Sequence, residues 1–255
     1  MDKAAFEREA DRLLGLAAEQ DVVLRLVGAL AFARRCPKHV YLQDALGREY
    51  TDIDFAGYGR EADRIRAVLS GAGYVADPHV FVESGGTRMV LLNAETGLHL
   101  DVFLDKLEFC HTVPWKGRLE IDEHTIPLAE MLMQKMQIIE INEKDLIDTM
   151  MLLLEHPLTD DDGGVNIARV AKVCAKDWGW WRTLTMNLGN VEQMSASYTQ
   201  LPADEKRRVA DQVAAARARL EGEPKSLGWK LRARVGDRKK WYRDVGELQP
   251  AMEDT

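Results

Sequence analysis

Two aspartates separated by one residue lie inside a short apolar run, residues 50–55 (YTDIDF), and this feature constrains the fold most strongly. In a β-strand, residues i and i+2 point to the same face, so Asp52 and Asp54 share a face and Ile53 and Phe55 point to the other. Neighbouring carboxylates repel each other and resist burial, and a divalent cation held by oxygen ligands relieves both costs. The pair therefore predicts a strand that carries a magnesium site.

A third carboxylate has a similar setting, because Asp101 is the single acid within residues 98–103 (LHLDVF). Three carboxylates that converge from strands onto metal are typical of phosphoryl or nucleotidyl transfer. The alternative is structural, since an Asp near a strand end often forms a turn or caps a helix. That alternative is the stronger one for Asp101 taken alone and the weaker one for the Asp52–Asp54 pair.

Composition limits the classes of protein to consider. The chain has 255 residues, enough for one large or two modest domains, and its net charge of −8 excludes a global basic field for nucleic acid or anionic membrane. Its three cysteines are widely spaced and odd in number, which argues against a disulfide framework. The sequence begins without a secretory apolar segment and has no apolar stretch of about 18 residues, so we expect a cytoplasmic protein with no membrane partner.

Residues 1–126 alternate helical and strand patterns. An apolar run at 22–27 leads through Gly28 and Ala29 into a short helix, a turn that lets backbone approach a ligand and offers helix N–H groups to phosphate. The predicted helices cover 3–20, 30–35 and 59–71, and the predicted strands cover 22–27, 39–42, 50–55, 74–82, 87–94 and 98–104. The pattern indicates an α/β core with an antiparallel part.

Residues 127–255 are predicted to be helical. Two helices at 127–155 are expected to pack on the core, and an acidic, glycine-rich linker separates them from residues 165–255. Within 225–243, eight Lys or Arg residues and one Asp are interleaved with Trp229, Trp241 and Tyr242. This basic tail suits a phosphate backbone, and it equally suits a helix face that balances acids elsewhere.

The order of these features resembles the nucleotidyltransferase superfamily, the fold of DNA polymerase beta and kanamycin nucleotidyltransferase. Its members carry a Gly-Gly or Gly-Ser turn, a helix, an Asp-x-Asp or Asp-x-Glu strand and a third acid on a neighbouring strand. Residues 48–55 (REYTDIDF) look more narrowly like the AbiEii-type branch, which includes toxins of bacterial toxin–antitoxin pairs. In that branch a lysine and a Lys-Asp-x-x-Asp segment follow on helices, as do 134–136 (QKM) and 144–148 (KDLID) here.

The resemblance covers about residues 20–155. It implies an α+β fold in which helices flank a nucleotidyltransferase-like mixed sheet and a helical C-terminal region follows. It also implies a metal-dependent transfer of a nucleoside monophosphate from an NTP to a small molecule, a protein or RNA, and it raises the question of an antitoxin partner. The basic tail mildly favours RNA as the acceptor.

Carried over by position, the resemblance implies a role for seven residues. Gly28 and Ala29 approach the triphosphate, Lys135 contacts phosphate, and Asp148 orients that lysine. The implied catalytic residues and ligands of Mg²⁺ or Mn²⁺ are Asp52, Asp54 and Asp101, the last also as a base for the acceptor hydroxyl.

Two departures keep another reading open. Ala29 stands where a second glycine or serine is usual, and the connection from Gly28 to Asp52 is long enough to suggest an inserted hairpin. The alternative is a non-catalytic module that retains the fold and binds a nucleotide or a partner. A further alternative is a helical regulator whose acids are merely scattered.

Overall fold

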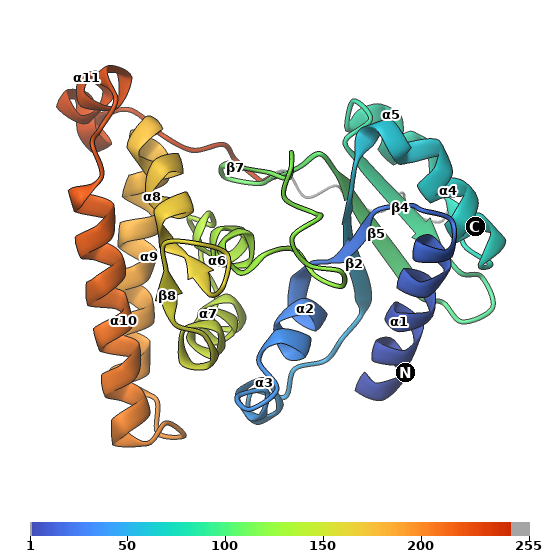
Figure 1. The fold of residues 1–255 in the computed structure, drawn as a ribbon, viewed down its shortest axis with the longest axis horizontal. Helices are drawn as coiled ribbons and strands as arrows, with labels where there is room; N and C mark the ends of the chain where they lie inside the picture. The colour runs from blue at the N-terminus through green and yellow to red at the C-terminus, as the bar shows by residue number, and fades with distance from the viewer. Residues whose placement is uncertain (1, 246–255) are drawn as a thin grey trace.

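The computed structural model describes residues 2–245 and shows an α+β protein built on a mixed five-stranded sheet (Figure 1). The strand order is β1-β2-β5-β4-β3, in which β2 and β5 are parallel and the other neighbouring pairs are antiparallel. The strands of this sheet are β1 (Leu24–Leu26), β2 (Asp52–Gly57), β3 (Val75–Ala76), β4 (Arg88–Leu92) and β5 (His99–Leu104). The predicted Asp-x-Asp strand is therefore confirmed, as an interior strand of the sheet beside the central strand β5.

Helices cover both faces of the sheet. Figure 1 shows α1 (Lys3–Glu19) and α4 (Ala62–Gly71) on one side and α2 (Gly28–Arg35) on the other, toward the helical region. Asp2 caps α1 by accepting a hydrogen bond from the Ala5 N–H at 2.8 Å, which satisfies one free donor of the first turn. The sheet is thus buried on both faces, as its mostly apolar strands require.

The predicted strand at 74–82 is wrong over most of its length. Strand β3 has two residues, and α5 (Pro78–Glu83) follows it. Asp77 accepts a hydrogen bond from the His79 N–H at 2.8 Å, and Pro78 occupies the first turn, where its missing N–H costs nothing. This capping signal outweighs the β propensity of the valines that follow.

The predicted short strand at 39–42, and with it the suggested hairpin, is also wrong. The chain instead forms the helix α3 (Tyr41–Ala45), entered through a turn in which the Leu42 N–H donates to the His39 carbonyl at 3.0 Å. A strand needs an open sheet edge, and the free edge of β1 is already covered by residues 124–126. Local helical hydrogen bonds are what remains available to this segment.

The chain after residue 126 is mainly helical, as predicted. Figure 1 shows α6 and α7 nearest α2, and α8, α9 and α10 farther from the sheet, with α11 at one end. The helices are α6 (Leu128–Met136), α7 (Glu143–Glu155), α8 (Ile167–Lys176), α9 (Trp178–Ser197), α10 (Ala203–Gly222) and α11 (Leu227–Val235). The remaining elements are the 3-10 turns η1 (Gly59–Glu61) and η2 (Gly236–Arg238), the antiparallel pair β6 (Lys106–Glu108) and β7 (Thr112–Pro114), and the parallel pair β8 (Leu158–Thr159) and β9 (Val165–Asn166).

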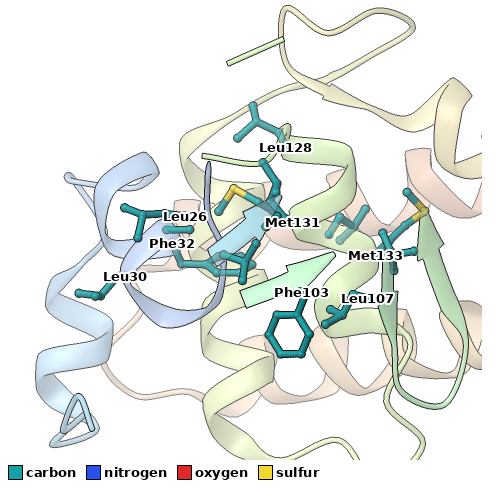
Figure 2. Packing of buried hydrophobic residues seen from close by; sticks show 14 of the residues in the cluster. Leu26, Leu30, Phe32, Phe103, Leu107, Leu128, Met131 and Met133 are labelled. Atoms are coloured by element: carbon teal, nitrogen blue, oxygen red, sulfur yellow. The ribbon is translucent and has the colours of Figure 1, made fainter. Parts of the chain in front are cut away.

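A single contiguous hydrophobic cluster runs through both parts of the chain, from Phe6 to Leu220. Figure 2 shows Phe32 of α2 and Met131 of α6 in this cluster together with Phe103 of β5. The sheet and helices α6 and α7 therefore share one core, which fixes the position of α6 relative to the aspartate-bearing strands. Within residues 2–245, no helix combines the length and apolar character needed to cross a membrane.

Candidate active site

Strands β2 and β5 bring the three predicted carboxylates to one region of the sheet. The two strands are parallel neighbours, and their register sets Asp54 opposite Asp101 and Asp52 opposite His99. Asp52 is exposed, Asp54 is partly buried and Asp101 is buried. The predicted grouping of three carboxylates is therefore present in the geometry, at different depths from the surface.

Gly28 lies directly against Asp54. Its φ angle is +68°, in the left-handed region, and a Cβ atom at this position would lie 2.2 Å from Oδ2 of Asp54. The Val27 N–H donates to the Asp54 carbonyl at 3.0 Å, which holds the start of α2 beside β2. Glycine is thus required here by both the backbone and the carboxylate, independently of any ligand. Ala29 follows in the first turn of α2.

Asp54 is the electrostatic centre of the group. Burial raises its pKa to about 7, with smaller contributions from the negative charges of Asp52 and Asp101. The positive charges of Lys135 and Arg88 act in the opposite direction and only partly compensate. A carboxylate whose ionised form is this poorly compensated favours the approach of a cation.

Arg88 of β4 forms a two-pronged ion pair with Asp101. Its Nε lies 2.8 Å from Oδ1 and 2.9 Å from Oδ2, and Nη2 also donates to Oδ2. Burial raises the pKa of Asp101, and the guanidinium opposes that rise. The sequence reading did not identify Arg88, because the pairing depends on the β4–β5 register, which sets Val90 opposite Asp101 and Arg88 diagonally across from it.

Lys135 is buried on α6 between two acids of α7. Its Nζ lies 2.8 Å from Oδ1 of Asp145 and 2.9 Å from Oδ2 of Asp148, which is fully buried. Burial acts to lower the lysine's pKa, and the two carboxylates outweigh it, so the pKa is raised and Lys135 is charged. Asp148 therefore does orient Lys135, while the ammonium group is engaged by protein carboxylates rather than open to a phosphate.

Two further polar residues extend this network toward the Asp-x-Asp strand. Gln43 of α3 donates to Oδ1 of Asp148 at 2.6 Å and accepts from the Tyr50 hydroxyl at 2.6 Å. Arg48 lies 3.8 Å from Oδ2 of Asp148. Neither Gln43 nor Arg48 was predicted as part of the site. Gln43 was missed because it lies on the helix α3, in a segment that was not predicted to be helical. The network ties α3, α6 and α7 to the segment that precedes β2.

The carboxylates allow a divalent cation to bind, with Asp52 and Asp54 as the free ligands. Among residues 2–245, no group of three or more His, Cys, Asp or Glu side chains has the arrangement of a formed metal site. Both oxygens of Asp101 accept hydrogen bonds from Arg88, so this carboxylate is not a free ligand. The grouping of Asp52, Asp54 and Asp101 on adjacent strands is the observation that fits a cation, and two oxygen-bearing residues that are not fully buried suit magnesium, which retains several waters.

The basic tail contacts α9 and the β6–β7 pair. A cavity of about 550 Å³ lies between α9 and the α11–η2 segment, and its lining residues include Trp178, Trp181, Arg182 and Arg234. Several tail charges have local partners: Lys240 pairs with Asp244, and the remaining pairs within the tail's surroundings are Arg243 with Glu108 and Asp237 with Arg182. The expectation that basic residues of the tail balance acids elsewhere is met by Arg243 with Glu108, whereas Asp244 directly follows the tail and Asp237 is the acid of the tail itself.

In comparisons with known proteins, no protein-family model, no curated protein and no solved structure matches this chain. The candidate site is therefore defined by its geometry alone.

Proposed function

We propose that the protein transfers a nucleoside monophosphate from an NTP to an acceptor hydroxyl. The observation that carries this proposal is the pairing of Asp54 with Asp101 on adjacent parallel strands, with Asp52 on the same strand face as Asp54 and the start of α2 against them. In the reaction, the acceptor oxygen forms a bond to the α-phosphorus and its hydroxyl proton passes to water, while the bond from that phosphorus to the bridging oxygen breaks and pyrophosphate leaves. Such transfers need charge neutralisation and in-line positioning more than covalent chemistry.

Asp52 and Asp54 are the residues that would hold Mg²⁺ or Mn²⁺, which would supply positive charge to the phosphates. The start of α2 suits the triphosphate, because the first turn of a helix offers backbone N–H donors, here from Gly28 and Ala29. The Gly28 N–H donates to Oε1 of Gln134 at 3.4 Å and would exchange that partner for a phosphate oxygen. Lys135 adds a buried positive charge behind Asp54 and positions α6, with Asp148 holding the lysine. Asp101 completes the anionic group and anchors Arg88.

The test is incubation of the protein with each α-labelled NTP, Mg²⁺ or Mn²⁺, and total RNA or cell extract. D52N and D54N should abolish labelling, while D63N, which removes an exposed acid of α4, should label like the wild type. Label on one fraction with the wild type alone supports the proposal and identifies the acceptor class. Equal labelling by the wild type and D54N would refute it.

The second candidate function is a non-catalytic module that binds a nucleotide or a partner. Two observations favour this second function. Ala29 stands where the family usually has a serine or a second glycine, and both oxygens of Asp101 accept hydrogen bonds from Arg88. This function predicts that NTP with Mg²⁺ raises the melting temperature while no label is transferred to any fraction. The same measurement on D54N shows whether the stabilisation depends on the carboxylates.

The basic tail leads us to propose RNA as the acceptor. Lys239 and Lys240 are exposed, so K239E/K240E should weaken RNA binding and reduce its dependence on salt concentration. The matched control is K38E/K116E, which reverses two exposed lysines elsewhere in the chain. Unchanged RNA binding in K239E/K240E would remove the tail from the proposal and leave the proposed chemistry in place.

We also propose a cytoplasmic location, which the sequence composition leads us to expect, and an antitoxin partner, which the resemblance suggests. Three free, buried cysteines support a reducing compartment. An antitoxin would be supported if a neighbouring gene product relieves growth arrest caused by the wild type and binds it, and growth unaffected by the wild type would count against a toxin.

A further inference from the structure

Arg88 uses both oxygens of the third carboxylate. Its Nε is within 2.9 Å of each Asp101 oxygen, and Nη2 donates to Oδ2 as well. A guanidinium fork on a carboxylate is a strong, directional arrangement, and this one is partly shielded, with 28% of the Arg88 side chain and 12% of the Asp101 side chain exposed. Asp101 is therefore committed to an arginine rather than available as a metal ligand.

The charge of Arg88 acts on the whole group. The negative charges of Asp54 and Asp52, besides that of Asp101, contribute to raising the arginine's pKa, so the guanidinium lies within the field of all three carboxylates. When all three carboxylates are ionised, they and the guanidinium have a net charge of −2, which one divalent cation neutralises. A second dication would leave an excess of positive charge and would need lone pairs that Asp101 has already given to Arg88.

We propose that Arg88 takes the place of a second divalent cation in the nucleotidyl-transfer site. Asp52 and Asp54 hold a single cation, Asp101 acts as a positioning residue for Arg88, and Arg88 binds the phosphates of the nucleotide. Nη1 of Arg88 has no hydrogen-bond partner within residues 2–245, so a donor remains for a phosphate oxygen while the fork stays closed on Asp101. This inference rests on the proposed function, because it assigns the ligands of that same site.

The number of bound cations tests the inference without any measurement of transfer. We would titrate the protein with Mn²⁺ alone and follow free Mn²⁺ by electron paramagnetic resonance. The wild type should bind one Mn²⁺ per chain, and R88M should bind two, because it frees Asp101 and removes a positive charge. R66M is the matched control, since Arg66 is a half-buried arginine of α4 that pairs with Asp63, and it should bind one.

Phosphate binding gives a second readout. With only one Mn²⁺ supplied per chain, inorganic tripolyphosphate should bind R88M ~10-fold more weakly than the wild type, because a charge-assisted hydrogen bond is lost and no second cation replaces it. R88Q retains a hydrogen-bond donor for Asp101 but lacks the positive charge. Both measurements can therefore be made on R88Q if R88M does not fold. If the wild type binds two Mn²⁺, or if R88M and R88Q each bind one, the proposed role of Arg88 is refuted while the proposed function is not. No Mn²⁺ bound by the wild type would overturn the proposed function itself.

Discussion

At the scale of single residues, the contact between Gly28 and Asp54 is the tightest constraint in the site. The left-handed φ angle of +68° and the 2.2 Å approach of a hypothetical Cβ to Asp54 Oδ2 are independent reasons for glycine. One is a property of the backbone and the other a property of the neighbouring side chain. Substitutions at the two positions can therefore separate the two effects.

We expect G28A to lower the free energy of unfolding by about 2–3 kcal/mol, from left-handed strain and from the clash. G28A should cost less in a D54A background, by about 1 kcal/mol, because the clashing carboxylate is absent. Chemical denaturation of the four proteins gives this coupling energy. G15A is the control, since Gly15 lies within α1 with open space around it and its replacement should stabilise by about 0.5–1 kcal/mol. Additive effects of G28A and D54A would contradict the predicted clash.

The raised pKa of Asp54 predicts a specific pH dependence of stability. The folded protein keeps this proton up to about pH 7, whereas the unfolded chain releases it near the ordinary value of 3.8. Since the folded state binds more protons between these values, the Asp54 contribution is favourable at low pH and is lost as pH rises through about 7.

D54N removes this titration. Without divalent cations, D54N should gain stability relative to the wild type by about 1–2 kcal/mol between about pH 5 and pH 8, the value being modest because the carboxylate is partly solvated. Urea denaturation at several pH values measures the difference, and D63N should run parallel to the wild type. Parallel profiles for D54N and the wild type would show that Asp54 titrates normally.

At the scale of elements, Lys135 holds α6 and α7 together through buried charge. Asp145 and Asp148 both lie within 2.9 Å of its Nζ. Removing one partner of a buried ion pair leaves the other charged and without solvent. The free-energy cost of that buried charge exceeds the stabilisation that the intact pair provides.

K135M should therefore lower the free energy of unfolding by about 3–5 kcal/mol. K144M is the control: it changes an exposed lysine of α7, one helical turn before Asp148, and should alter the free energy of unfolding by no more than about 0.5 kcal/mol. Thermal denaturation of the two variants beside the wild type makes the comparison. A K135M protein as stable as K144M would mean that the acids are solvated rather than buried.

The elements that the sequence predicted correctly are those with strong periodicity or an unusual residue in an apolar run, such as β2, β5 and α1. The errors, at α3 and α5, concern short segments where β-branched and aromatic residues competed with capping and with the absence of a free sheet edge. Asp52, Asp54 and Asp101 were grouped correctly because each lies in a strand. Arg88 and Gln43 could not be found, since their contacts depend on strand register and on a helix that the sequence reading had assigned otherwise.

At the scale of the whole molecule, the hydrophobic cluster from Phe6 to Leu220 joins the predicted parts 1–126 and 127–255. We expect one cooperative unfolding transition. Tryptophan fluorescence reports mainly on the helical part, because five of the six tryptophans follow residue 126, while circular dichroism reports on the whole chain. The two urea curves should coincide. Separate midpoints would show that the two parts are independent domains.

The junction between the two parts has a consequence for any attempt to produce the sheet by itself. Residues 124–126 lie beside β1: the Leu26 N–H donates to the His124 carbonyl at 2.7 Å, and the Ile126 N–H donates to the Leu26 carbonyl at 3.0 Å. The segment that leads into the helices therefore also caps the outer strand. A fragment that stops before it would present unsatisfied main-chain donors and acceptors along an apolar strand, and such edges recruit further copies into aggregates.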